Sequence, residues 1–329
     1  MERDPGNPLR GPVFVTGATG FVGRHVVRRL QRQGFGVRAL TRDPARQPFD
    51  SSIEVVAGDL TRPETYAAGL AGASAVVHCA LTENYAADTT ATAALLDLAA
   101  QTGIRKFIHL SSIVIYGNPQ RGVITEDTPP LPTADAYTRT KLAIEDVLRA
   151  QPKVPELAVL RLGCVYGPGG GWWSAGILNL MRQGRMVLVD GGSGAANLIH
   201  VEDVATLILL LLGRDNPPCD VFNVTDGMPV AWSRYFAGLE SILGRGATVS
   251  MTAAEAREHG RKWLRPSFAR RLLRKAQGTR RIHPLEENSI AWLTSTAVYS
   301  NRKAAEALGF RPTFDLNKGI DSLRQGAAT

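Results

Sequence analysis

Apolar residues are spaced along this chain in two distinct patterns. Short apolar runs, such as those at residues 13–15 and 157–162, are typical of strands that are buried on both faces of a sheet. The longer segments between them repeat apolar residues every three or four positions, which is typical of amphipathic helices. Because strands and helices alternate, the pattern predicts an α/β fold with a Rossmann-type, doubly wound parallel sheet. The predicted strands are residues 13–15, 36–40, 53–57, 75–79, 106–110, 157–162 and 221–224.

The pattern also divides the chain into two parts. Residues 12–168 and about 198–226 form the predicted sheet and its helices. Residues 169–197 and 227–329 are expected to form a smaller, mostly C-terminal α/β part. A chain of 329 residues has ample apolar material for both parts.

A glycine-rich turn, TGATGFVG at residues 16–23, follows the first strand directly, and a helical pattern begins at Arg24. Its first glycine permits a tight turn, its second lets the backbone approach a pyrophosphate, and its third removes a side chain where the helix meets the strand. The spacing differs from the commoner G-x-G-x-x-G. The turn predicts that the sheet part binds a dinucleotide. The expected contacts in the turn are Gly17, Thr19, Gly20, Phe21, Val22 and Gly23.

The end of the second predicted strand bears on the choice of dinucleotide. In folds of this kind an acid at that position binds the 2′-hydroxyl of the adenine ribose, and a nearby arginine accommodates a 2′-phosphate. Here Thr41 occupies the place of the acid, and Arg42 follows it. This favours NADP(H) as the cofactor and leaves NAD(H) as the alternative. The plainer explanation of Arg42 is a solvated loop cation.

Later strand ends supply further candidate contacts with the dinucleotide. Asp59, followed by Leu60, is placed either to bond the adenine amino group or to cap the next helix. The small and apolar residues Cys79, Ala80 and Leu81 would let the dinucleotide lie across the end of the fourth strand.

A polar pair and a tyrosine–lysine pair are the candidate chemical groups. Ser111 and Ser112 follow the strand at 106–110, at the sheet edge where open α/β folds bind ligands. Tyr137 and Lys141 are four residues apart and therefore share one face of a predicted helix. The lysine ammonium is expected to lower the pKa of the tyrosine toward working pH, which would suit general acid–base chemistry.

With these residues in view, the chain resembles the extended short-chain dehydrogenases/reductases, the group that includes the NAD-dependent epimerase/dehydratase family. Its C-terminal part is closer to members that resemble 3β-hydroxysteroid dehydrogenases. The resemblance spans about residues 12–325. Its motifs are TGATGFVG (16–23), GDL (58–60), SSIVIYG (111–117), YTRTK (137–141), LRLGCVYGPG (160–169), LIHVEDVA (198–205) and YSNRKAAEALGFRP (299–312).

The resemblance implies roles for individual residues. Tyr137 is the expected general acid/base, Lys141 the expected partner of the nicotinamide ribose, and Ser112 the residue expected to hydrogen-bond the reacting oxygen. It also implies that Ser111 lies against the cofactor, and that the turn containing Cys164 and Val165 closes over the nicotinamide. A homodimer through the helices around residues 90–102 and 137–150 is a further implication.

Departures from the family pattern concern the substrate. Members that act on sugar nucleotides usually carry Asn where this chain has Cys164, and Arg where it has Asn197. Their late Arg-Pro-Gly-Asp segment is replaced here by residues 295–299. A site without these partners binds a diphosphate less well, so a mainly apolar small molecule is favoured. The candidate substrate contacts are Ser112, Tyr166, Trp172, Trp173 and Asn197.

The net charge of +8 suggests anionic partners without choosing among them. Residues 255–281 contain ten Lys or Arg residues and two acids, interleaved with apolar residues. They are either a solvated helix that packs one face on the substrate part or, through residues 257–281, a peripheral contact with an anionic surface. We find no nucleic-acid motif and no metal-ligand spacing.

A cytoplasmic location is the expectation from two observations. The first ten residues carry charges and prolines rather than an apolar signal segment. Cys79, Cys164 and Cys219 are scattered and read as free thiols.

The leading hypothesis is therefore an NAD(P)-dependent oxidoreductase that transfers hydride between the cofactor and a secondary alcohol or ketone of a small molecule. One alternative is a sugar-nucleotide epimerase or dehydratase that retains its NAD. Another is a sensor that binds the dinucleotide without turnover.

Overall fold

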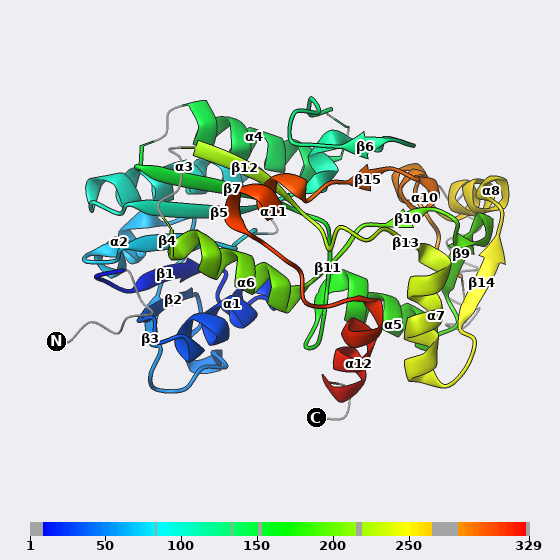
Figure 1. The fold of residues 1–329 in the computed structure, drawn as a ribbon, viewed down its shortest axis with the longest axis horizontal. Coiled ribbons are helices and arrows are strands. Elements are labelled where there is room, and N and C mark those ends of the chain that lie inside the picture. The colour runs from blue at the N-terminus through cyan, green and yellow to red at the C-terminus, as the bar shows by residue number, and fades with distance from the viewer. Residues whose placement is uncertain are drawn as a thin grey trace.

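The structure is a computed structural model that describes residues 9–82, 84–131, 133, 135–150, 153–214, 219–264 and 282–326. Within these ranges the largest sheet has seven strands, all parallel, in the order β12-β7-β5-β4-β1-β2-β3 (Figure 1). This confirms the predicted α/β Rossmann-type fold. The strands are β1 Val13–Thr16, β2 Val37–Thr41, β3 Glu54–Ala57, β4 Ala75–His78, β5 Lys106–Ser112, β7 Glu156–Leu162 and β12 Cys219–Val224.

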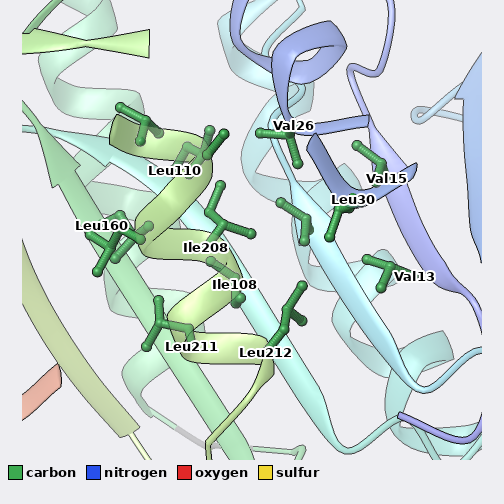
Figure 2. Close-up of a cluster of buried hydrophobic side chains, with 14 of the residues drawn as sticks. Val13, Val15, Val26, Leu30, Ile108, Leu110, Leu160, Ile208, Leu211 and Leu212 are labelled. Atoms are coloured by element: carbon green, nitrogen blue, oxygen red, sulfur yellow. The ribbon is translucent and has the colours of Figure 1, made fainter. Parts of the chain in front are cut away.

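Helices cover both faces of this sheet because the strands are apolar on both sides. On one face, α1 (Phe21–Arg32) and α6 (Val201–Leu212) pack against the strands in one hydrophobic cluster. Figure 2 shows Ile208 and Leu211 of α6 beside side chains of β5 and β7 in this cluster. On the other face, α3 (Tyr85–Gln101) and α4 (Ala136–Ala150) pack against each other and against the sheet. The short helices α2 (Ala67–Leu70) and α11 (Arg302–Leu308) complete these two layers.

A second hydrophobic cluster lies beyond the C-terminal ends of the strands (Figure 1). It is built largely from the segments after β7 and from the C-terminal third of the chain. Its helices are α5 Ile177–Arg182, α7 Trp232–Leu243, α8 Ala253–Leu264, α10 Glu287–Thr294 and α12 Leu316–Gly326.

Four small strand pairs lie outside the main sheet in the described residues. Three of them are parallel, and the pair β10–β13 is antiparallel. The pairs are β8 Cys164–Tyr166 with β11 Leu198–His200, β9 Met186–Val189 with β14 Thr248–Met251, β10 Ala195–Ala196 with β13 Val230–Ala231, and β6 Val123–Ile124 with β15 Val298–Tyr299.

The structure extends the strand predicted at residues 106–110. Strand β5 continues through Ser112 because its pairing with β7 includes Ser111 and Ser112. Of the basic segment 255–281, residues 265–281 lie outside the described residues, so the surface contact expected for 257–281 stays a prediction. No helix in the described ranges combines the length and the apolar character that a membrane crossing requires.

Candidate active site

The glycine-rich turn forms a narrow cradle at the N-terminus of α1. Gly17 has a φ of +62°, and a Cβ atom there would lie 2.7 Å from the Cα atom of Ala80. A Cβ atom on Gly23 would lie 2.1 Å from the carbonyl oxygen of Gly17. Gly20 is the N-cap of α1 and supplies no side-chain cap, and the first turn of this helix contains no acid. The Gly20 N–H donates to the carbonyl oxygen of Gly17 at 3.0 Å, and the N–H groups that follow it in the first turn of α1 are placed to bind an anion, which fits a dinucleotide pyrophosphate.

Among the other predicted strand-end contacts, Cys79 and Ala80 border this turn. Asp59 accepts hydrogen bonds from the backbone N–H and the hydroxyl of Thr61, and these bonds hold the pKa of its carboxyl below the usual value. Asp59 does not cap the next helical turn, which begins after Arg62, so that alternative is wrong. Leu60 is buried. The remaining contacts are exposed or half-buried, namely Thr19, Phe21, Val22, Arg42, Cys79, Ala80 and Leu81.

The loop after β8 is fastened to the start of α1. Arg24 donates a hydrogen bond to the carbonyl oxygen of Gly169, and the Nε2 atom of His25 lies 3.0 Å from the carbonyl oxygen of Pro168. The two residues expected to face the nicotinamide, Cys164 and Val165, lie just before this loop, in β8. The loop therefore lies beside the start of α1, and its closure over the nicotinamide stays a prediction.

Ser112, Tyr137 and Lys141 come together behind this turn. Ser112 is the last residue of β5, and its side chain lies close enough to Tyr137 of α4 to lower the pKa of that tyrosine. Lys141 is 5% exposed, and its Nζ atom donates to the carbonyl oxygen of Leu110 at 2.7 Å. The same Nζ atom lies 5.9 Å from the centroid of the Tyr137 ring. One helix thus presents the tyrosine and the lysine to the end of one strand.

The pKa of Tyr137 differs from the expectation. We expected Lys141 to lower it, but burial raises the pKa of Tyr137, and only the nearby side chain of Ser112 acts in the opposite direction. Burial also lowers the pKa of Lys141 to about 8, although the nearby carboxylates of Asp88 and Glu145 favour its charged form. Desolvation is the largest cause of both pKa shifts.

A buried polar network stabilises the C-terminal end of β5. Glu145, one helical turn after Lys141, accepts hydrogen bonds from Arg161 at 2.7 and 3.2 Å and from the Ser111 hydroxyl at 2.5 Å. Arg161 also donates to the Tyr116 hydroxyl at 2.6 Å. The hydroxyl of Ser111 therefore donates to Glu145. This corrects the implication that the Ser111 hydroxyl lies against the cofactor. The sequence did not point to Glu145 or Arg161 as site residues. The one available signal is that Glu145 is spaced one helical turn from Lys141.

A cavity of about 330 Å³ adjoins Ser112, and such a volume is in the range of small-molecule sites. The candidate substrate contacts Trp172 and Trp173 line it, and so does Cys164, which was expected to face the nicotinamide. Tyr137 is not among the described lining residues, but its neighbour Ser112 is. The sequence did not reveal that the segment around α10 forms one wall. The lining residues contributed by that segment are His283, Leu285, Glu286, Asn288, Ser289, Trp292 and Leu293.

Two candidate substrate contacts are wrong. Tyr166 is fully buried in the second hydrophobic cluster, and its hydroxyl lies against α12. The amide of Asn197 donates to the carbonyl oxygens of Ala195 and Ala297 and accepts from the N–H of Tyr299. Because its bonds are made to backbone groups, Asn197 joins chain segments and does not line the cavity.

The chain is similar to known proteins over nearly its full length. It is 26% identical to a 4-hydroxy-2-methyl-3-oxo-4-farnesyl-3,4-dihydroquinoline-1-oxide ketoreductase of Stigmatella aurantiaca, over 95% of each chain. It is also 26% identical to a 3-beta-hydroxysteroid dehydrogenase of Mycolicibacterium neoaurum, over 94% of this chain and 89% of the relative.

The fold is shared with solved structures of the same kind. A structure of MoeE5 in complex with UDP-glucuronic acid and NAD superposes with a TM-score of 0.75 at 23% identity, over 97% of this chain and 99% of the other. The sequence profile of the NAD dependent epimerase/dehydratase family matches residues 13–225. This match includes the glycine-rich turn, Ser112, Tyr137 and Lys141, and the chain therefore belongs to the NAD dependent epimerase/dehydratase family.

Proposed function

We propose that this protein is an NAD(P)-dependent oxidoreductase that acts on a secondary alcohol or ketone of a small molecule. The observation that carries the proposal is the juxtaposition of Ser112 and Tyr137 beside a cavity, with Lys141 buried next to them. The family and the named ketoreductase and dehydrogenase relatives agree with it. The bound dinucleotide supplies or accepts the hydride.

The chain's own residues handle the proton and the reacting oxygen. The Ser112 hydroxyl orients and polarises the carbonyl oxygen at the inner end of the cavity. The Tyr137 hydroxyl gives its proton to that oxygen during reduction and takes it back during oxidation. Lys141, held by the carbonyl oxygen of Leu110, places positive charge behind Tyr137 and favours its ionised form when the proton leaves.

NADP(H) is the proposed cofactor, and its support lies at the end of β2. Thr41 is buried there, and its hydroxyl accepts a hydrogen bond from the N–H of Asp43. Asp43 in turn bonds the N–H of Ala45, so its carboxylate is engaged in a local turn. Arg42 is exposed beside this end, where its charge is available to a 2′-phosphate.

We propose further that the protein is cytoplasmic and forms a homodimer. All three cysteines are free, which agrees with a reducing compartment. Helices α3 and α4 pack side by side, and a shallow groove between them is lined by Ala93, Leu96, Val147, Ala150 and Lys153. We propose that a second copy packs on this pair of helices, and sedimentation of the purified protein tests it.

The first experiment identifies and counts the dinucleotide released when freshly purified protein is denatured. We expect less than stoichiometric dinucleotide, and then faster oxidation of NADPH than of NADH with a ketone. Stoichiometric NAD would instead favour an epimerase or dehydratase that retains its cofactor.

The second experiment compares Tyr137→Phe with Tyr85→Phe. The Tyr85 ring lies 6.1 Å from the Tyr137 ring but is not part of the cavity lining, so it is a matched control. Loss of the Tyr137 hydroxyl is expected to lower kcat by about 10²–10⁴-fold. An unchanged kcat in Tyr137→Phe would contradict the proposal, and the sensor alternative would then gain support.

A further inference from the structure

The cavity beside Ser112 has two unlike ends. Its inner end carries polar groups of the sheet part, including the Ser112 side chain and the chain at Gly163 and Cys164. Its far wall comes from α5, β9 and the segment around α10, and it combines apolar side chains with the polar side chains of Asn288 and Ser289. The apolar residues of that wall are Ile177, Leu180, Met186, Val187, Leu285 and Leu293.

Indole rings line the cavity between these ends. Trp173 stacks on the buried ring of Trp232 at 5.2 Å, and its carbonyl oxygen accepts a hydrogen bond from the Tyr235 hydroxyl. Trp172 is 54% exposed beside it, and Trp292 lines the cavity from α10. Large apolar rings that are held in place on several sides favour a ligand with a bulky apolar body.

The charged side chains among the described lining residues are acidic. Asp135 and Glu286 line the cavity, and none of the described lining residues is Lys or Arg. The Asp135 carboxylate accepts a hydrogen bond from the N–H of Thr138 at 2.7 Å, which fixes it at the start of α4. Glu286 is exposed at the start of α10. Within the described residues, neither carboxylate forms an ion pair.

This charge pattern disfavours an anionic ligand. A carboxylate or phosphate that leaves water needs partners that offset its charge. The described lining offers neutral hydroxyl and amide groups, such as those of Ser112, Asn288 and Ser289, but no cation, and its two carboxylates would repel an anion. Asn197 offers no compensation, because its amide is bonded to backbone groups of other segments.

We propose that this cavity takes an uncharged, largely apolar ketone or secondary alcohol, with the reacting oxygen toward Ser112, and that Asp135 and Glu286 select against anions. Only the placement of the reacting oxygen rests on the proposed function. The selection by charge is a property of the cavity and can be measured without turnover.

The experiment uses three probes with one skeleton and one ketone. They are 4-phenylbutan-2-one, its para-carboxylate 4-(3-oxobutyl)benzoate, and its para-aminomethyl derivative, which is a cation. Binding to the full chain is followed by quenching of tryptophan fluorescence, and turnover by oxidation of NADPH. We expect the neutral ketone to bind at least about ten-fold more tightly than the benzoate, and the cation to bind more tightly than the benzoate.

Two variants connect this selection to the named carboxylates. In the double variant Asp135→Asn with Glu286→Gln, the ratio of the benzoate Kd to the neutral-ketone Kd is expected to fall by about three- to ten-fold, as the loss of two partly exposed charges predicts. Asparagine retains an oxygen that can accept from the N–H of Thr138, so α4 keeps its cap. Glu287→Gln is the matched control, because Glu287 pairs with Arg257 and is not part of the lining. This control should leave the ratio unchanged.

The outcomes separate the two proposals. Tight binding of the benzoate, no quenching by any of the three probes, or an unchanged ratio in the double variant would overturn the inference. If the neutral ketone binds with the expected preference but no NADPH is oxidised, the charge selection stands and the proposed oxidoreductase function fails for this ketone.

Discussion

Lys141 is a cationic side chain at a buried position. Its burial lowers its pKa to about 8, and the carboxylate of Asp88 is the largest of the effects that oppose this shift. Asp88 is itself 1% exposed. Both oxygens of its carboxylate accept from the N–H of Thr82, at 2.9 and 3.2 Å. The charge state of Lys141 is therefore set by a balance between desolvation and nearby negative groups, of which Asp88 on α3 has the largest effect.

The variant Asp88→Asn should lower the pKa of Lys141 further. The amide oxygen can still accept from the N–H of Thr82, but the negative charge that favours the ammonium is lost. Because the charged form of Lys141 supports Tyr137, activity is lost as pH rises through the Lys141 pKa. We therefore expect the basic limb of the kcat/KM profile to move to lower pH by about one unit.

Asp97→Asn is the matched control for this shift. Asp97 is on the same helix but forms its ion pair with Lys153 at the surface. An identical basic limb in the wild-type protein, Asp88→Asn and Asp97→Asn would contradict the role given to Asp88.

The ion pair between Glu145 and Arg161 joins α4 to β7. Each side chain is 2% exposed, and together they also hold the hydroxyls of Ser111 and Tyr116. Charges at such depth cost much desolvation energy, and each one relies on the other. The helix that carries Tyr137 and Lys141 is thus fixed to the sheet by a polar contact as well as by apolar packing.

Removal of one partner of this pair should be costly. Arg161→Met leaves Glu145 charged and unpaired, and we expect the free energy of unfolding to fall by about 3–5 kcal/mol, measured by urea denaturation. The double variant Glu145→Leu with Arg161→Met should recover much of this loss, since it buries no charge. A double variant that is less stable than Arg161→Met would refute this account.

The start of α1 offers a separate test of dinucleotide binding. Gly20→Asp places a carboxylate at the N-cap, where it can accept from the same N–H groups that we assign to the pyrophosphate. We expect NADPH to lose its effect on the Tm of this variant, while the Tm without ligand changes little. Gly20→Ala adds a methyl group without charge. It therefore distinguishes electrostatic repulsion of the pyrophosphate from steric crowding by the new side chain. Retained NADPH binding in Gly20→Asp would argue against this site.

Elements built from neighbouring residues could be predicted, and contacts between distant segments could not. Strand β5 reads as a buried apolar run, and the spacing of Tyr137 and Lys141 places them on one helical face. The bond from Ser111 to Glu145 spans 34 residues, and no local pattern reports it. Asn197 was misassigned for the same reason, since its partners at residues 297 and 299 lie about a hundred positions away.

The C-terminal segment ties the two parts of the molecule together. Asp203 of α6 accepts hydrogen bonds from the N–H groups of Thr313 and Phe314. The ring of His200 stacks on Phe314, with centroids 3.7 Å apart, and its Nε2 atom lies 3.0 Å from the hydroxyl of Ser322. The last described helix is thus anchored to a helix that covers the main sheet.

This anchoring predicts that the whole chain unfolds in one step. Calorimetry should show a single transition, and NADPH should raise its Tm although the dinucleotide contacts the sheet part. At a free NADPH concentration one hundred times Kd, the stabilisation should be about 2.7 kcal/mol. Two transitions, of which NADPH shifts only one, would show that the parts unfold independently.

The walls of the cavity and its reacting centre come from different segments of the chain. Leu180, Met186 and Leu293 belong to the second hydrophobic cluster, whereas Ser112 and Lys141 stand on the main sheet and α4. Replacement of a wall side chain changes the shape of the space while the groups that move the proton keep their supports. Substrate range can therefore diverge among descendants of such a chain without any change in the reaction that they catalyse.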